Sequence, residues 1–234
     1  MNIFYAQNID NSWIRLEAEE ARHCVQVLRK KIGDCIYVVD GNGNFYECEL
    51  TEAGKKNCLL SIQKTIQAYH QRSFYLHIAI APTKNINRLE WFLEKATEIG
   101  IDEITPLLCF HSERKIIKTQ RLNRVLLTAM KQSLKAKLPL LNPMTPFKDF
   151  IHNRKPTQQS FIAHCQQGNE NQLKEKYKSK QSVCILIGPE GDFSEAEILL
   201  ALSNGFEAIT LGPNRLRTET AGIVACHTVN LLSE

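Results

Sequence analysis

Long apolar runs are missing from this chain of 234 residues. The longest uncharged apolar stretch, Val183–Ile187, is far shorter than the roughly 20 residues that a membrane-spanning helix needs. Residues 1–6 carry neither the basic start nor the apolar core of a secretory signal. We therefore expect a cytoplasmic protein with no membrane partner. Hydrophobic residues make up 43% of the chain and charged residues 23%, which is the balance of a folded globular protein rather than a disordered one.

Several patterns that mark metal and nucleotide sites are also missing. The 8 cysteines include no C-x-x-C pair and the 7 histidines show no metal-ligand spacing, so we expect no metal. In a reducing compartment the cysteines are expected to be free thiols rather than disulfides. The chain has no P-loop, no G-x-G-x-x-G after the first strand of its α/β region, and no G-x-S-x-G elbow. These absences disfavour a P-loop nucleotide site and an ordinary dinucleotide site.

One stretch has almost no acidic side chains. Residues 114–155 hold 11 basic side chains and 1 acidic one, although the net charge of the whole chain is only +4. Such a concentration of positive charge predicts a surface that binds a polyanion such as nucleic acid. The alternative is a solvated helix face whose acidic partners lie elsewhere in the fold. The bases expected to contact phosphates are Lys115, Lys118, Arg121, Arg124, Lys131, Lys135 and Lys137.

The first 70 residues predict a small β-barrel with one helix. Segments rich in β-branched and aromatic residues indicate strands, and they lie at 3–5, 13–16, 35–40, 45–51 and 58–66. The Gly and Asn residues within 40–44 tolerate positive φ and predict a hairpin turn. A helix is expected over 17–29. On this helix His23 lies next to Arg22, and it either faces RNA or is a partly exposed helix histidine.

After a polar connector at 69–73, strands alternate with helices. Strands are expected at 74–81, 104–108, 161–164, 183–187 and 208–211, and helices at 86–100, 120–134, 147–152, 169–177, 194–203 and 218–232. Ser194 and Glu197 have the spacing of a capping box at a helix start. This alternation predicts an α/β domain with a largely parallel sheet. We therefore divide the chain into one domain at 1–70 and another at 73–234.

Two glycine-containing loops follow apolar strands near the C-terminus. The first spans residues 187–194 and reads IGPEGDFS, and the second spans 211–221 and reads LGPNRLRTETA. Ligands of open α/β sheets bind at the carboxyl ends of strands, and a glycine there lets a ligand approach the backbone. We expect Gly188 and Gly212 to have this role. Together the loops predict a small-molecule pocket, whereas each Gly-Pro pair alone is also typical of an ordinary turn.

These segments resemble a known family. The two loops, residues 83–90 (TKNINRLE), residues 94–101 (EKATEIGI) with Pro106-Leu107, and the Arg22-His23, Leu28-Arg29 and Gly33-Asp34 pairs are similar to the small-subunit (16S) rRNA uridine N3-methyltransferases. That family belongs to the SPOUT, or trefoil-knot, class. The resemblance covers essentially the whole chain. Its GPEG and RTETA signatures are specific together and weak singly.

The resemblance implies a PUA-like β-barrel RNA-binding domain over 1–70 and a SPOUT α/β-knot methyltransferase domain over 73–234. The last strands and helix would form a deep trefoil knot that binds S-adenosylmethionine. The implied donor-binding residues are Ile187, Gly188, Pro189, Glu190, Gly191, Leu211, Gly212, Asn214, Leu216, Arg217, Thr220 and Ala221. The implied RNA-binding residues are Arg22, His23, Arg29, Lys84, Arg88, Arg121, Arg124, Lys131 and Lys135.

The resemblance further implies a homodimer with each active site near the subunit interface. The substrate would be a uridine of 16S rRNA near the decoding region, presented in the small ribosomal subunit. Three positions depart from the family pattern. Asp192 stands where a second glycine is frequent, Asn214-Arg215 where Arg-Ile is frequent, and Leu134-Lys135 where Gly-Arg is common.

The chemistry of such a reaction points to particular side chains. Because N3 of uracil carries a proton, the reaction needs positive charge or hydrogen-bond donors where negative charge develops on the uracil oxygens. Arg217 precedes a helix N-terminus, which also favours anions, and is our candidate for this role. Glu219 either accepts the proton, orients Arg217 or caps the helix. Glu190 is either a base or a loop organiser.

The sequence therefore favours an S-adenosylmethionine-dependent methyltransferase that acts on N3 of a uridine in 16S rRNA. Two alternatives stay open at this point. One is a non-catalytic RNA-binding ribosome-assembly factor on the same scaffold. The other is a small-molecule α/β enzyme whose basic helix only docks a partner. Binding of S-adenosylmethionine separates the first interpretation from most versions of the other two.

Overall fold

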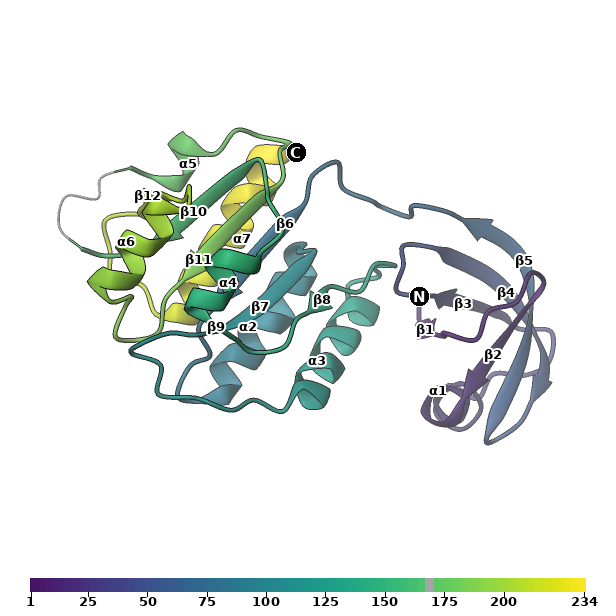
Figure 1. Ribbon diagram of the computed structural model, residues 1–234. Coiled ribbons are helices and arrows are strands. Elements are labelled where there is room, and N and C mark those ends of the chain that lie inside the picture. The colour runs from purple at the N-terminus through teal and green to yellow at the C-terminus, as the bar shows by residue number, and fades with distance from the viewer. Residues whose placement is uncertain (167–170) are drawn as a thin grey trace. The chain divides into compact units, whose positions relative to one another are not determined.

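The computed structural model describes residues 1–166 and 171–234, and Figure 1 shows how their helices and strands are arranged. The chain forms two compact units. The N-terminal unit consists of Met1–Gln71 and Leu127–Leu138, and the C-terminal unit consists of Arg72–Leu126 and Pro139–Glu234. The basic helix α3 (Thr119–Gln132) thus begins in one unit and ends in the other.

The N-terminal unit is built on a sheet with the strand order β1-β3-β4-β5-β2. β1 pairs with β3 in parallel, and the other neighbours are antiparallel. All five strands contribute to one apolar core, and so does the helical segment that lies between β2 and β3. In this core Phe4, Ile14 and Leu60 are almost fully buried. The predicted strands are confirmed with small shifts at their ends: β1 (Ile3–Tyr5), β2 (Trp13–Glu17), β3 (Cys35–Val39), β4 (Phe45–Ala53) and β5 (Asn57–Ile66).

The hairpin turn between β3 and β4 is confirmed, and hydrogen bonds within the turn itself stabilise it. Asp40 Oδ1 accepts hydrogen bonds from the backbone N–H groups of Asn42 at 2.7 Å and Asn44 at 3.1 Å. Gly43 has a φ of +103°, a conformation that favours glycine. The carboxylate and the glycine together fix the turn and therefore the register of the two strands.

The single helix predicted over 17–29 is wrong in its form. A short helix α1 (Ala18–Arg22) passes directly into a π-helical turn η1 (His23–Val27), in which the N–H of Leu28 donates to the His23 carbonyl. The segment leaves this turn at Arg29, whose φ is +53°. The apolar spacing could not reveal the π-helical turn, because over so few residues an α-helix and a π-helix both place Ala21 and Cys24 in the core.

The C-terminal unit contains a parallel sheet, as predicted. Its strand order is β12-β10-β11-β6-β7-β8, with β9 paired to β7, and every pair is parallel. The central strands are buried along their whole length, as strands covered on both faces are. The strands are β6 (Leu76–Ile80), β7 (Glu103–Leu108), β8 (Leu140–Leu141), β9 (Thr145–Pro146), β10 (Gln159–Ala163), β11 (Val183–Ile187) and β12 (Glu207–Ile209).

Helices cover both faces of this sheet (Figure 1). On one face α7 packs against α2, and Gly222 allows their close approach, since a Cβ there would lie 2.6 Å from Cε2 of Phe92. On the other face α4 and α6 bury Phe150 and Ile198. The capping box of Ser194 and Glu197 at the start of α6 is confirmed. The helices are α2 (Ile86–Ile99), α4 (Phe147–Asn153), α5 (Leu173–Lys176), α6 (Glu195–Ser203) and α7 (Thr218–Ser233).

Three details of the C-terminal half differ from expectation. The helix expected over 169–177 is only the single turn α5, and residues 169–170 of that prediction lie outside the described residues. The strands β8 and β9 are two residues long and therefore too short to produce a sequence pattern. The basic helix ends at Gln132, and Met130 and Ala136 pack against Phe45 of the N-terminal unit.

The connector leads into the C-terminal unit at Arg72. Its guanidinium forms an ion pair with Asp102 at 2.5 Å and donates to the Gly100 carbonyl at 2.8 Å and to Asn230 Oδ1 at 3.1 Å. These bonds fix the start of the unit to the end of α2 and to α7.

Among the described residues, no helix is both long enough and apolar enough to cross a membrane.

Candidate active site

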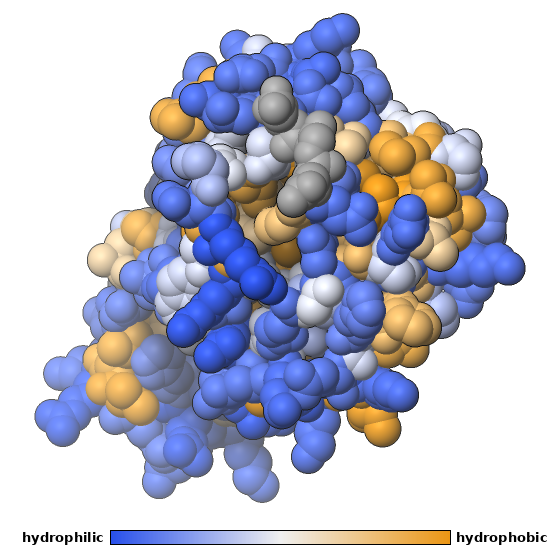
Figure 2. Space-filling view, turned by 90° about the vertical axis from the view of Figure 1, so that its left-hand side faces the viewer, coloured by the Kyte–Doolittle hydropathy of each residue, from blue (hydrophilic) through white to orange (hydrophobic). Residues whose placement is uncertain are grey.

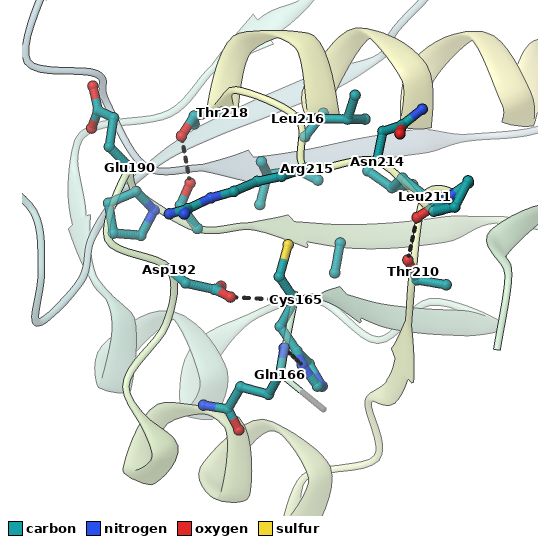
Figure 3. Close-up of a pocket in the computed structure, with 18 of the residues that line it drawn as sticks. Cys165, Gln166, Glu190, Asp192, Thr210, Leu211, Asn214, Arg215, Leu216 and Thr218 are labelled. Atoms are coloured by element: carbon teal, nitrogen blue, oxygen red, sulfur yellow. Dashed lines mark hydrogen bonds between the residues drawn. The ribbon is translucent and has the colours of Figure 1, made fainter. Parts of the chain in front are cut away.

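A cavity of about 860 Å³ lies at the carboxyl edge of the parallel sheet, where three loops meet. The loops follow β10, β11 and β12, and Figure 3 shows their side chains around the cavity. The lining includes apolar residues such as Ile187 and Leu216 as well as polar side chains. The lining residues are Ala163, His164, Cys165, Gln166, Gln172, Ile187, Gly188, Pro189, Glu190, Asp192, Thr210, Leu211, Gly212, Pro213, Asn214, Arg215, Leu216, Thr218 and Ala221.

The loop after β11 is tied to the start of α7. The Thr218 hydroxyl donates to the Gly188 carbonyl at 3.0 Å, as the dashed line in Figure 3 shows. A Cβ at Gly188 would lie 3.2 Å from the ring and the backbone N of Phe193. Glycine at this position therefore lets the loop fold back on Phe193. Gly188 also lines the cavity, so its expected role of letting a ligand approach the backbone stays a prediction.

The loop after β12 has an open backbone at its glycine. Gly212 has a φ of +130°, and no atom lies within 4 Å of the place where its Cβ would be. The Thr210 hydroxyl donates to the Gly212 carbonyl at 3.0 Å and fixes the turn. Arg215 extends along the cavity toward the loop that carries Glu190 (Figure 3). Gly212 thus exposes peptide groups to the cavity, which is the property that a ligand-binding glycine needs.

The loop after β10 forms a third wall that the sequence interpretation missed. The N–H of Cys165 donates to Asp192 Oδ2 at 2.9 Å and so joins this loop to the loop after β11. Burial lowers the pKa of His164 and raises the pKa of the Cys165 thiol. In this loop the described residues directly after the strand, 164–166, contain no glycine. The signal that could have found it is the apolar strand just before it, which pairs with β11 and ends at the same edge.

Most of the residues expected to bind the methyl donor meet in the cavity. Those that line it are Ile187, Gly188, Pro189, Glu190, Leu211, Gly212, Asn214, Leu216 and Ala221. Gly191, Arg217 and Thr220 do not line it. Gly191 instead faces His111, whose Cβ would be 3.0 Å from a Cβ at position 191. Arg217 is exposed at the first position before α7.

The two candidate catalytic residues have very different surroundings. The Arg217 side chain is exposed and makes no cap hydrogen bond to α7. The Glu219 side chain is 9% exposed, and its Oε1 lies 3.7 Å from Nε of Arg88 on α2. Glu219 Oε2 is buried and has no hydrogen-bond partner among the described residues. The structure therefore gives Glu219 a spare acceptor atom.

A second hollow of about 430 Å³ adjoins the cavity, since Glu190 lines both. Lys84, Asn85, Arg88 and Glu113 complete its lining. Glu190 Oε1 accepts a hydrogen bond from the N–H of Lys84 at 2.9 Å, which supports its interpretation as a loop organiser. Glu113 lies 2.7 Å from the Lys84 ammonium and its hydrogen bond raises the pKa of that group.

The residues expected to bind RNA occur in both units. In the N-terminal unit Arg22 and Arg29 are exposed, while His23 is half-buried with its ring 5.7 Å from that of Phe4. This half-buried position agrees with the interpretation of His23 as a partly exposed helix histidine. Lys135, at the end of the basic segment, is half-buried.

The basic helix itself is partly neutralised. Arg121 donates to Glu90 Oε2 at 2.8 Å, and Lys131 is paired with Glu20. Arg124 is exposed and has no ion pair with another described residue. Acidic partners from elsewhere in the fold thus exist for some of these bases, as the alternative interpretation expects, but not for all.

The end of the molecule seen in Figure 2 is mostly hydrophilic, with several separate apolar patches. Leu199 and Leu202 of α6 are 60% and 40% exposed. Within residues 1–166 and 171–234, no group of three or more His, Cys, Asp or Glu side chains is placed to hold a metal ion.

The arrangement of loops and sheet matches one family of proteins. A family model described as an RNA methyltransferase domain matches residues 70–230, and a second, described as an RNA methyltransferase PUA domain, matches residues 16–63. The chain belongs to the RNA methyltransferase family. The first match contains all three loops of the cavity, and the second contains the helical turn with Arg22 and His23.

Named relatives and solved structures resemble this RNA methyltransferase over nearly its whole length. The ribosomal RNA small subunit methyltransferase E of Rickettsia conorii is 28% identical over 227 residues, which cover 95% of this chain and 91% of that protein. The structure of a probable rRNA-methyltransferase from Porphyromonas gingivalis has a TM-score of 0.93 and 41% identity, and covers 100% of this chain and 98% of its own. A Legionella pneumophila protein with the cofactor SAM bound has a TM-score of 0.87 and 25% identity, covering 99% and 97%.

Proposed function

We propose that this RNA methyltransferase transfers a methyl group from S-adenosylmethionine to N3 of a uridine in 16S rRNA, near the decoding region of the small ribosomal subunit. Family membership, the name of the Rickettsia conorii relative and the cofactor in the Legionella pneumophila structure support this proposal. Because the substrate is ribosomal, the enzyme acts in the cytoplasm. The observation that carries the proposal is the cavity that three loops form at the carboxyl edge of the sheet.

The residues of the cavity fit the chemistry of this donor. The volume of about 860 Å³ is that of a site for a medium-sized ligand. Leu211, Leu216 and Ala221 offer apolar contacts for an adenine ring, and the exposed peptide groups around Gly212 offer donors and acceptors for its edge. Glu190 gives the lining negative charge, which suits a cationic sulfonium. When bound, the donor supplies an activated methyl group.

The acceptor uridine enters, in this proposal, through the second hollow. Lys84 and Arg88 line that hollow and supply positive charge for a nucleotide phosphate. The hollow shares Glu190 with the donor cavity, so a base held there would lie beside the donor. Its lining comes from the segment before α2, from the first turn of α2 and from the loop after β11, and it could receive a base that has left its stack.

Arg217 and Glu219 act on the proton and the negative charge of the uracil imide. The exposed guanidinium of Arg217, just before the N-terminus of α7, stabilises negative charge that develops on the uracil oxygens. Glu219 accepts the N3 proton or orients the arginine. Its buried Oε2, which has no hydrogen-bond partner among the described residues, supports a role as an acceptor.

We propose a different role for each of the two units. The N-terminal unit is proposed to be a PUA-like β-barrel RNA-binding domain, with Arg22, His23 and Arg29 on its RNA-binding side and a boundary near residues 70–73. Arg124 of the basic helix, which belongs to the C-terminal unit, is proposed to contact RNA as well. The C-terminal unit is proposed to be a SPOUT domain in which the loops around the cavity belong to a trefoil knot.

The active protein is proposed to be a homodimer. Leu231 of α7 is 57% exposed and Trp91 of α2 is 44% exposed, and these two helices pack together on one face of the sheet. Apolar side chains of this size on adjacent helices favour a protein interface. Sedimentation at micromolar concentration is expected to give a dimer, whereas a mass of only 26.7 kDa would contradict the proposal.

Two measurements test the function. Isothermal titration is expected to show stoichiometric binding of S-adenosylmethionine to the purified protein. Small ribosomal subunits from a strain that lacks this gene should then acquire a reverse-transcription stop at one uridine when they are incubated with enzyme and donor, because an N3 methyl group blocks base pairing. Donor binding without a new stop would leave an RNA-binding protein rather than a uridine N3-methyltransferase.

A further inference from the structure

Asp192 has an unusual combination of backbone strain and hydrogen bonds. Its φ is +62°, in the left-handed region where non-glycine residues are uncommon. Oδ1 accepts from the N–H of Phe193 at 2.8 Å, and Oδ2 accepts from the N–H of Cys165 at 2.9 Å. Its main-chain carbonyl lies 3.0 Å from Nδ1 of His111. One residue thus joins three segments of the chain.

The hydrogen bond from Cys165 holds the wall of the cavity that follows β10. β10 ends at Ala163, so Cys165 lies outside the sheet and its N–H has no partner strand. Figure 3 shows the Asp192 carboxylate pointing across the cavity edge to Cys165. A charged acceptor gives a stronger bond to a backbone N–H than a neutral one does. The position of Cys165 therefore depends on the Asp192 side chain.

A glycine at this position would adopt the same backbone without strain but would lose the link. The aspartate thus occupies a conformation that costs free energy and, in return, holds the loop after β10 against the loop after β11. Its side chain does not contact Arg217 or Glu219 in any described hydrogen bond or ion pair. Its effect is therefore expected on the cavity and not on the candidate catalytic groups.

We infer that Asp192 is a positioning residue for methyl-donor binding, which acts by fixing Cys165 and its loop as the third wall of the cavity. This inference rests on the proposed function, because it takes the ligand of the cavity to be S-adenosylmethionine. When the loop is held in place, the free protein already has the binding conformation. When it is released, the apparent affinity falls in proportion to the fraction of molecules that keep that conformation.

The test compares Asp192→Gly and Asp192→Asn with the unaltered protein in isothermal titrations with S-adenosylmethionine. The glycine variant is expected to bind the donor about tenfold more weakly, as it would if the loop kept its place in a tenth of the molecules. Its thermal stability should change little, because the relief of strain is offset by the loss of the two hydrogen bonds to the carboxylate. The asparagine variant tolerates the same φ and keeps an acceptor, so its affinity should stay within about threefold of the original.

Lys180→Gly is the matched control. Lys180 is exposed, has a φ of +60° and lies in the turn before β11, away from the cavity lining. Its replacement should relieve the same strain without changing donor affinity. In methyl transfer at saturating donor, Asp192→Gly should recover most of the original kcat while its KM for the donor stays raised. Loss of kcat at saturation would instead assign Asp192 to the chemical step.

Amide hydrogen exchange at Cys165 tests the link without any ligand. Exchange is expected to be faster in Asp192→Gly than in the unaltered protein, and close to the original rate in Asp192→Asn. Unchanged exchange in the glycine variant, or unchanged donor affinity, would overturn the inference, as would a failure of asparagine to restore affinity. If the unaltered protein does not bind S-adenosylmethionine, the proposed function fails, and the exchange experiment still decides whether Asp192 fixes the loop.

Discussion

Nε of Arg88, in the first turn of α2, lies 3.7 Å from Oε1 of Glu219, in the first turn of α7. The pair joins the second hollow, which Arg88 lines, to the helix that begins beside the cavity at the carboxyl edge of the sheet. The Glu219 side chain is 9% exposed and the Arg88 side chain 39%, so the arginine is the partner that solvent reaches. The second carboxylate oxygen of Glu219, Oε2, is buried and has no hydrogen-bond partner among the described residues.

We predict that Glu219→Gln slows single-turnover methylation by about 10²–10⁴, the range for loss of a positioned proton acceptor. Raising the pH toward the ionisation of uracil N3 should restore the rate, because the substrate then no longer needs the acceptor. Glu195→Gln is the matched control, since Glu195 is an exposed acid in the first turn of α6. A Glu219→Gln enzyme with a normal rate at neutral pH would rule out proton transfer to this residue.

The ion pairs of the basic helix predict which arginine binds RNA. Arg124 is exposed without an ion pair among the described residues, whereas Arg121 is already held by Glu90. Arg124→Ala should therefore reduce the slope of log affinity against log salt by about 0.7–0.9, the value for one lost phosphate contact. Arg121→Ala should change the slope less. Equal effects of the two substitutions on binding to ribosomal RNA fragments would show that Glu90 releases Arg121 in the complex.

Backbone strain at the end of the basic helix predicts a stabilising substitution. Leu134 has a φ of +57° just after α3 and is 37% exposed. A left-handed conformation costs a non-glycine residue about 1–2 kcal/mol, and part of this gain is offset by the greater freedom of glycine in the unfolded chain. Leu134→Gly should therefore raise the free energy of unfolding by about 0.5–1 kcal/mol in urea denaturation. Thr128→Gly, inside the same helix, should instead lower it by about 0.3–0.5 kcal/mol.

The sequence predicted most of the fold because its signals are local. Alternation, helix spacing and the capping box of Ser194 are properties of short segments, and so the strands, the parallel sheet and the start of α6 agree with expectation. The π-helical turn at His23 was missed, because nothing in a five-residue pattern distinguishes it from an α-helix. The strands β8 and β9 exist only through their pairing with β7, which the sequence does not report.

The candidate site was predictable where glycines mark the loops. It was not predictable where a contact joins residues that are far apart in the sequence. The loops at Gly188 and Gly212 carry their own signals. The wall at Cys165 depends on a bond to Asp192, a residue 27 positions away, and the pairing of Glu219 with Arg88 joins two helices. The close neighbours of Gly188 and Gly191, which are Phe193 and His111, lie elsewhere in the fold and leave no sign in the sequence around either glycine.

A buried polar cluster at the other edge of the sheet predicts a pH dependence of stability. His77 Nε2 lies 2.8 Å from Thr105 Oγ1, and burial lowers the pKa of the imidazole to about 4. Between this value and the usual pKa of about 6.5 the unfolded chain binds the proton and the folded chain does not. Stability should therefore fall as the pH drops from 6.5 toward 4, by at most about 1.4 kcal/mol per pH unit.

Urea denaturation at pH 7 and pH 5 measures this effect. The fall should be smaller in His77→Gln, which keeps a side chain able to pair with Thr105 but does not titrate. Glu103 lies 3.7 Å from the imidazole, and its own pKa is lowered by His77, Tyr75 and Asn142, although burial opposes this shift. Its contribution is present above its unfolded pKa of about 4.3 and is lost at lower pH. A difference between the two proteins that appears only below pH 4 would assign the effect to Glu103.

The last prediction separates the two candidate catalytic residues. If Arg217 stabilises the developing imide anion, Arg217→Ala should slow single-turnover methylation by about 10²–10³ at saturating donor. Arg217 does not line the donor cavity, so donor affinity should be unchanged. Arg217→Lys should restore little, because an ammonium lacks the planar fork that contacts two acceptors at once. Arg215→Ala is the control on the same loop, and because Arg215 lines the cavity it should weaken donor binding and leave the saturated rate intact. A normal rate for Arg217→Ala beside a pH-restored Glu219→Gln would assign the chemistry to proton removal by Glu219 alone.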